Sequence, residues 1–283
     1  MMTHERTPTA SPAAAVATEW SMATTELVRL RDGGTLEVVV EGDHPQVVLI
    51  PSARRGAADF ATLASDLRAA GYGSVALNMR GIGRSSPAVG QPTLRDIADD
   101  IADVIEAMDV GPMHIVGHAQ GNIFARVTAA YRPEVVRSVA LLACGGHDLG
   151  ESPPTDLVIE NFERCARTDL SDDERVKSLG IVFFAPGNDA SVWLTGWWPS
   201  GDVREALTNT DSSEWATAGT VPVLLVQPLE DAMSPATVGQ TLHKMLGDRG
   251  TYVEVAHCGH AMLPEQPEII AREVVRFLRD IDR

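Results

Sequence analysis

One seven-residue segment constrains the fold of this chain more than any other. The run from Val116 to Asn122 joins a short apolar stretch to a segment with helical spacing. Gly117 and Gly121 lack the side chains that would clash where a strand turns sharply into a helix. The residue between them is therefore expected to be strained and to present its side chain at the end of the strand. In this chain that residue is Ala119.

The rest of the chain alternates between the spacings of strands and helices. Strands are predicted over 27–30, 36–40, 47–50, 74–78, 114–116, 135–143, 221–226 and 252–255, and helices over 58–70, 94–108, 123–131, 234–246 and 267–278. The first two strands read as an antiparallel hairpin. Thr93 and Asp96 predict a capping box at the start of the second helix. Such alternation is typical of an α/β fold with a mostly parallel central sheet and helices on both faces.

The alternation stops in the middle of the chain, which predicts an inserted segment. We expect a disordered tail over 1–25, a first core part over 26–146, a helical lid over 147–219 and a second core part over 220–283. The inserted segment holds most of the tryptophans beside two phenylalanines, namely Trp193, Trp197, Trp198, Trp215, Phe183 and Phe184. These rings form either an apolar inner face of the lid, which would bind substrate, or only the lid's own core.

Charge and hydropathy exclude several classes of function. The chain has 283 residues and a formal net charge of -16, so nucleic acid and anionic membranes are not expected partners. It lacks an apolar run of about 18 residues, and the short apolar stretch near its start carries little positive charge. We therefore expect a cytoplasmic protein with a small-molecule substrate. The sequence does not indicate its oligomeric state.

Two candidate catalytic side chains follow later strands. Asp231 comes after the strand over 221–226, and His260 comes after the strand over 252–255. Because the carboxyl ends of parallel strands meet at one edge of a sheet, both should lie near Ala119. The chain order is then the strained turn, an acid and a histidine.

From Glu26 onward the chain resembles the α/β-hydrolase superfamily, in particular bacterial members with Gly-His-Ala-x-Gly-Asn at the nucleophile elbow. The matching positions are Asp231 with Pro235, Gly259 with His260, and Arg80, Gly81, Gly83 and Ser85 in a structural loop. The resemblance implies that Asp231 orients His260 as a general base and that no metal or organic cofactor is needed. It also implies an oxyanion hole formed by the N–H of Gln120 and an N–H after the third strand. We assign the second donor to Ala53, although Pro51 and Ser52 stand where the family usually has His-Gly.

Other residues are weaker candidates for these roles. Glu230 is a second choice for the acid. His257, Cys258 and His260 resemble metal ligands, but they lack a fourth ligand and a paired spacing. The possible substitute nucleophiles Ser52, Ser85 and Cys144 do not lie on the elbow.

Alanine at the elbow changes the expected chemistry, because a methyl group cannot attack a carbonyl to form an acyl-enzyme. Three interpretations stay open. Ala119 is native and the dyad of Asp231 and His260 activates water or removes a substrate proton, in ester or acyl hydrolysis, elimination or cyclisation. Alternatively, Ala119 is an engineered replacement of serine in a conventional esterase, or the chain is a ligand-binding or interaction protein without catalysis. We favour the first, with a small, apolar organic substrate.

Overall fold

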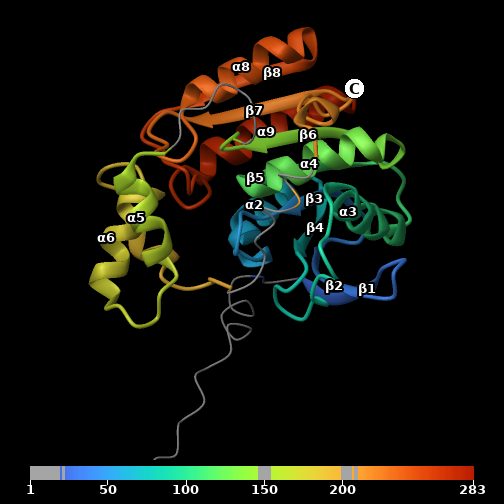
Figure 1. The fold of residues 1–283 in the computed structure, drawn as a ribbon. Coiled ribbons are helices and arrows are strands. Elements are labelled where there is room, and N and C mark those ends of the chain that lie inside the picture. Colours follow the sequence, from blue (N-terminus) through green and yellow to red (C-terminus); the bar gives the residue numbers. More distant parts are fainter. Residues whose placement is uncertain (1–19, 21–22, 146–153, 199–205, 207–209) are drawn as a thin grey trace, which may run out of the picture.

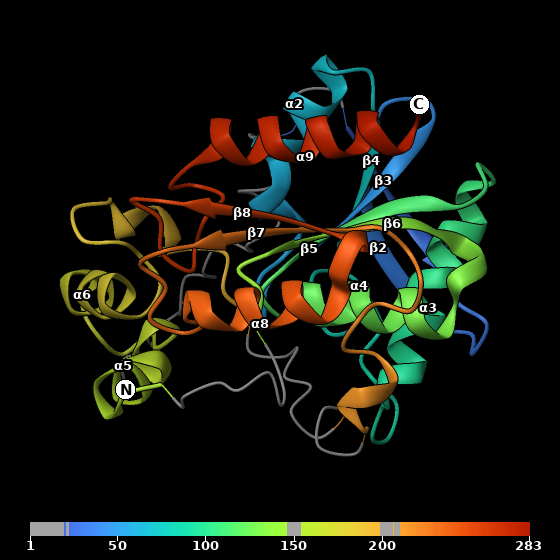
Figure 2. The same ribbon diagram turned by 90° about the horizontal axis from the view of Figure 1, so that it is seen from above.

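The computed structural model describes residues 20, 23–145, 154–198, 206 and 210–283, and within them the chain forms one eight-stranded sheet between two layers of helices (Figures 1 and 2). The strands are β1 (Thr24–Arg29), β2 (Thr35–Glu41), β3 (Pro45–Ile50), β4 (Gly73–Asn78), β5 (Met113–His118), β6 (Val136–Leu142), β7 (Val223–Pro228) and β8 (Gly250–Val255). Their order is β1-β2-β4-β3-β5-β6-β7-β8. β2 runs antiparallel to its two neighbours, and the remaining pairs are parallel. The predicted hairpin and mostly parallel sheet are confirmed.

Each face of the sheet is covered by its own set of helices. Figure 2 shows α2 (Ala61–Ala69) and α9 (Pro267–Ile281) on one face, and α3 (Leu94–Met108), α4 (Gln120–Tyr131) and α8 (Ala236–Leu246) on the other. The apolar side chains of α9 explain its position, since Ile270, Val274 and Leu278 recur at four-residue spacing and are fully buried. Two apolar cores result, one on each side of the sheet.

The inserted segment includes two helices beyond one end of the sheet, α5 (Asp156–Cys165) and α6 (Asp172–Val182) (Figure 1). It also includes the short 3-10 helices Ala190–Trp193 and Ser212–Glu214. Further 3-10 helices lie outside the insertion, at Ala57–Phe60, Pro133–Val135 and Gly247–Arg249. An aromatic cluster with Phe183, Phe184 and Trp193 joins α6 to Ala261 of the main core. The insertion therefore packs at the edge where the parallel strands end.

Helix α3 begins and ends at local signals. The Thr93 hydroxyl accepts a hydrogen bond from the N–H of Asp96, whose carboxylate accepts one from the N–H of Thr93 at 2.7 Å. This confirms the predicted capping box. At the other end, Asp109 adopts a left-handed conformation with φ 52° and stops the helix.

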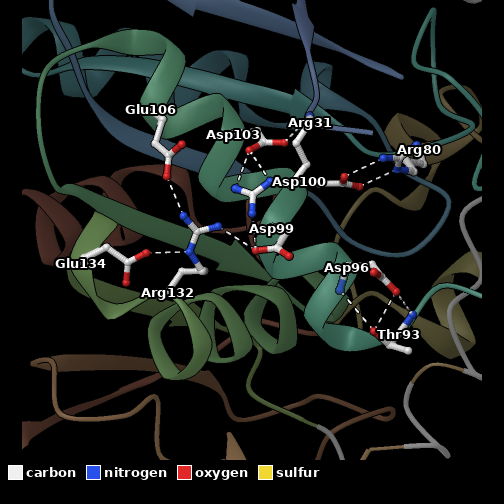
Figure 3. A network of polar contacts seen from close by, with 10 residues as sticks. All are labelled: Arg31, Arg80, Thr93, Asp96, Asp99, Asp100, Asp103, Glu106, Arg132 and Glu134. Atoms are coloured by element: carbon white, nitrogen blue, oxygen red, sulfur yellow. Dashed lines mark hydrogen bonds and ion pairs between the residues drawn. The ribbon is translucent and has the colours of Figure 1, made fainter. Parts of the chain in front are cut away.

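The acidic side chains of α3 are paired with three arginines from separate loops (Figure 3). The guanidinium of Arg31 donates a hydrogen bond to the Asp103 carboxylate, and that of Arg132 donates one to the Asp99 carboxylate. The Arg80 guanidinium donates to both carboxylate oxygens of Asp100, at 2.6 and 2.7 Å. These pairs join α3 to the β1–β2 turn, to the loop after β4 and to the end of α4.

Two element boundaries and the position of one side chain differ from the sequence prediction. The tail predicted over 1–25 lies largely outside the described residues, but β1 already begins at Thr24, and Trp20 packs against the core of α2 and α9. Helix α4 begins at Gln120 and not at 123, because Gly121 and Asn122 lie within its first turn despite being typical turn residues. Trp215 is 1% exposed and lies in the core beneath α4, so it does not join the other aromatic rings of the insertion.

In the described part of the chain no helix is both long and apolar enough to cross a membrane.

Candidate active site

The turn between β5 and α4 has the geometry expected of a nucleophile elbow. Ala119 adopts φ 50° and ψ -110°, a backbone conformation that is strained for any residue except glycine. Its N–H donates to the carbonyl of Leu142 at 2.9 Å. A Cβ atom at Gly117 would lie 2.1 Å from the carbonyl oxygen of Gly121, and one at Gly121 would lie 2.1 Å from that of Ile50. Both glycines are thus required for this close approach of backbone segments.

The predicted acid and histidine meet at the same edge of the sheet. Nδ1 of His260 lies 2.8 Å from Oδ2 of Asp231. The other carboxylate oxygen, Oδ1, accepts hydrogen bonds from the N–H groups of Met233 and Ser234 at 2.8 and 2.9 Å. The Asp231 side chain is fully buried and that of His260 is 8% exposed. Asp231 is therefore held in place by backbone donors and can keep the proton of His260 on Nδ1.

The second ring nitrogen of His260 is left available. Among the described residues none forms a hydrogen bond with Nε2, while the ring of Phe183 lies 5.8 Å from the imidazole, centroid to centroid. An unprotonated Nε2 beside an apolar ring can accept a proton from water or from a substrate.

His118, next to Ala119 in the chain, supports His260 from the interior. Its Nε2 lies 2.7 Å from the carbonyl oxygen of His260, and because a carbonyl only accepts, that nitrogen carries the proton. Complete burial and the nearby charge of His260 lower the pKa of His118 to about 4. His118 is therefore neutral near pH 7 and is packed rather than reactive.

The oxyanion hole is assigned to two backbone N–H groups. Gln120 is the first residue of α4, and Ala53 lies in the loop after β3. Within the described part of the chain, the N–H of neither residue has a hydrogen-bond acceptor. The loop lies against the elbow, since a Cβ at Gly121 would be 2.8 Å from the carbonyl oxygen of Pro51. The start of α4 also contributes the partial positive charge of a helix N-terminus.

Arg55 fixes this loop to the insertion, and the sequence analysis did not identify it. Its side chain is 4% exposed, and its guanidinium forms a double hydrogen bond with Asp59 at 2.6 and 2.9 Å and donates to the carbonyl of Thr195 at 2.6 Å. It also lies 4.5 Å from the ring centroid of Trp193 and 5.0 Å from that of Trp197. The only sequence signal was the unusual composition of the loop.

The three tryptophans assigned to substrate binding differ in position. Trp193 is 3% exposed and its ring lies 6.2 Å from that of His118. Trp197 is partly buried and donates from its indole N–H to the carbonyl of Trp193. The backbone N–H of Trp198 donates to the carbonyl of Arg54 at 2.9 Å. All three line the junction between insertion and core, and their contact with substrate stays a prediction.

The weaker candidates have structural partners. Oε2 of Glu230 accepts a hydrogen bond from the N–H of Cys258, whereas the carboxylate that pairs with His260 is that of Asp231. The Ser85 hydroxyl donates to the carbonyl of Asn78 at 2.6 Å. Across the described ranges, His, Cys, Asp and Glu side chains do not gather in threes that could hold a metal ion.

A cavity of about 530 Å³ lies beside α2 and the start of α9. Arg55, Trp193 and Leu263 are among its lining residues, whereas Ala119 and His260 are not. The cavity is therefore separate from the proposed reacting atoms, and we do not place the substrate there.

The sheet order, the strained elbow and the adjacent acid–histidine pair define an α/β hydrolase. The model of the alpha/beta hydrolase family matches residues 47–273, so the chain belongs to that family.

Curated relatives show the range of activities in this family. The chain is 26% identical over 232 residues to a Mycobacterium tuberculosis protein with the provisional name non-heme bromoperoxidase BpoC, covering 75% of this chain and 85% of the relative. It is 24% identical over 258 residues to an Azorhizobium caulinodans protein provisionally named carbamate hydrolase RutD, covering 83% and 92%.

Solved structures agree on the fold. A provisionally named lipase, Lip1, from Acinetobacter baumannii superposes with a TM-score of 0.78 over 99% of both chains at 17% identity. The structure of BpoC gives a TM-score of 0.70 at 23% identity, covering 87% of this chain and 96% of that one. These similarities support an enzyme of the α/β-hydrolase superfamily and leave its reaction open.

Proposed function

We propose that this chain is an enzyme that uses the dyad of Asp231 and His260 without a nucleophilic side chain. The observation that carries the proposal is the 2.8 Å hydrogen bond between Nδ1 of His260 and the buried carboxylate of Asp231, at an elbow that holds Ala119 in the strained conformation. This pair differs from the structural ion pairs of the chain because its second imidazole nitrogen has no partner among the described residues and it lies beside the elbow. The dyad therefore favours catalysis over ligand binding alone.

In the hydrolytic version of the reaction, water is the nucleophile. Nε2 of His260 takes a proton from water while the water oxygen bonds to the acyl carbon. The carbonyl oxygen becomes an oxyanion, stabilised by the N–H groups of Gln120 and Ala53. When the tetrahedral adduct collapses, the bond to the leaving group breaks and His260 returns the proton to it. The methyl group of Ala119 leaves space where a serine hydroxyl would otherwise stand.

The same groups can serve elimination or cyclisation. His260 would then remove a proton from the carbon next to a carbonyl, and the two backbone donors would stabilise the enolate. Both versions need a base and an oxyanion hole.

The surroundings favour a small, apolar organic substrate. Phe183 lies against His260, and Trp197 lies on Phe183 at 5.7 Å between ring centroids. We propose that the insertion acts as a lid and that Trp193, Trp197 and Trp198 form its apolar wall. Binding there would exclude water from the charged intermediate.

Turnover of a panel of acyl esters, thioesters and carbamates in ¹⁸O-labelled water, followed by mass spectrometry, tests the proposal. Asp231→Asn should reduce turnover by about 10⁴-fold because the imidazole loses its orienting anion. His260→Ala should abolish it while substrate binding is retained. Glu230→Gln is the matched control, because its carboxylate bonds the N–H of Cys258, and it should retain most activity. Turnover that survives loss of His260, or substrate that binds without conversion, would contradict the proposal.

A further inference from the structure

The peptide group that joins Ala119 to Gln120 is hydrogen-bonded in an unusual way. It supplies the N–H of Gln120 to the proposed oxyanion hole, and its carbonyl oxygen belongs to Ala119. That oxygen accepts two hydrogen bonds from one residue, Asn122: from the backbone N–H at 3.0 Å and from the side-chain Nδ2 at 2.5 Å. Both donors therefore bond the carbonyl end of this peptide group, while its N–H end faces the proposed oxyanion hole.

The orientation of the Asn122 amide is set by a buried cation. Its Oδ1 accepts a hydrogen bond from Nη2 of Arg126 at 2.8 Å, while Nδ2 also donates to the carbonyl of Ala143 at 3.2 Å. Because the guanidinium only donates, the amide oxygen must face Arg126 and the amide nitrogen must face Ala119. Asn122 and Arg126 are both completely buried.

Arg126 is held in this position by several other groups. Nη2 also donates to the carbonyl of Gly145 at 2.5 Å, Nη1 donates to that of Ala216 at 3.4 Å, and the guanidinium lies 4.9 Å from the ring centroid of Trp215. Burying a charge is costly, so an apolar residue would be expected here if packing were the only requirement. The elbow geometry is also already fixed by its two glycines and by the N–H of Ala119.

We propose that Asn122 and Arg126 are positioning residues that strengthen the oxyanion hole through this peptide group, an inference that rests on the proposed function. A hydrogen bond to an amide carbonyl favours the resonance form with negative charge on oxygen and positive charge on nitrogen. The N–H of Gln120 then becomes a stronger donor, and hydrogen bonds in such a chain reinforce one another. The positive charge of Arg126 acts along the path from its guanidinium through Asn122 to the Ala119 carbonyl.

Labelling kinetics in an Ala119→Ser background test the inference without a known substrate. A fluorophosphonate reacts when the hydroxyl oxygen at position 119 bonds to phosphorus, fluoride leaves and His260 accepts the hydroxyl proton. Adding Arg126→Met or Asn122→Ala should slow this labelling about three- to tenfold. Arg126→Lys should restore most of the rate, because an ammonium group can still donate to the Asn122 amide.

A second readout uses the chain with Ala119 unchanged. The ¹⁵N resonance of the Gln120 amide should move upfield in Arg126→Met and in Asn122→Ala, since its peptide carbonyl loses polarisation. Thr128→Val is the matched control: it removes another buried hydrogen bond of α4, from the hydroxyl to the carbonyl of Phe124 at 2.7 Å, away from the elbow. It should leave both the labelling rate and the Gln120 resonance unchanged.

The outcomes separate this inference from the proposed function. Unchanged labelling in folded Asn122→Ala, or an equal loss in Thr128→Val, overturns the role of Asn122 and Arg126 while the dyad stands. If the Ala119→Ser protein does not react at all, the proposed dyad and hole fail. The Gln120 resonance then still decides whether the peptide is polarised.

Discussion

One buried histidine, His118, should contribute strongly to the pH dependence of the free energy of unfolding. Its imidazole is fully buried and its Nε2 proton is donated to the carbonyl of His260. Burial is the main reason that its pKa falls from 6.5 to about 4 in the folded chain. The unfolded chain therefore binds a proton at a pH where the folded chain does not. The stability contributed by neutral His118 is fully present above pH 6.5 and is lost as the pH falls towards 4.

The size of this effect follows from the two pKa values. A shift from 6.5 to about 4 corresponds to a total of about 3 kcal/mol at 1.36 kcal/mol for each pKa unit. Between pH 7 and pH 5, linkage gives a loss of about 2 kcal/mol in the free energy of unfolding. Replacing His118 by a neutral residue removes this term and keeps the other titrating groups.

Urea denaturation followed by tryptophan fluorescence, at pH 7 and pH 5, measures the effect. His118→Gln is the appropriate variant because a glutamine amide can still donate to the carbonyl of His260. The unmodified chain should lose about 2 kcal/mol more in its free energy of unfolding than the variant over this interval. If the two proteins respond to pH equally, within about 0.5 kcal/mol, the reasoning about His118 is refuted.

Two further predictions concern the scaffold. Gly121→Ala should lower the free energy of unfolding by about 3 kcal/mol or more, because its Cβ would lie 2.1 Å from the carbonyl oxygen of Ile50. Gly180→Ala on α6, where a Cβ would meet its nearest neighbour at 4.0 Å, should instead be neutral or stabilising, and urea denaturation of both variants measures the difference. Arg80→Met should cost about 3 kcal/mol or more in urea denaturation because it leaves a buried carboxylate unpaired. Arg95→Met, which removes an exposed pair, should cost less than about 1 kcal/mol, and equal losses would contradict the argument.

Local signals in the sequence were enough to predict the fold, and the resemblance to the α/β-hydrolase superfamily added the dyad. Glycines at the elbow, the capping box at Thr93 and the alternation of apolar residues act within a few positions, so they can be interpreted without knowing the tertiary structure. Asp231 and His260 could be paired because parallel strands end at one edge. Their catalytic role stays a proposal.

Contacts between distant segments could not be predicted in this way. Arg55 is 140 positions from Thr195, whose carbonyl it bonds, and no periodicity relates them. Trp215 was grouped with the aromatic rings near it in sequence, but it packs beneath α4 beside Arg126. Asn122 resembled a turn residue, and its role at the Ala119 carbonyl depends on a helix that begins earlier than its composition suggested.

Covalent labelling of position 119 tests the central claim most directly. Intact-protein mass spectrometry after fluorophosphonate treatment should show one label on Ala119→Ser and none at this position of the unmodified chain. The double variant Ala119→Ser with His260→Ala should remain unlabelled, because the hydroxyl then has no base. This result would establish a competent base and oxyanion hole facing the alanine. An unreactive but folded Ala119→Ser protein, or labelling that does not depend on His260, would contradict the claim.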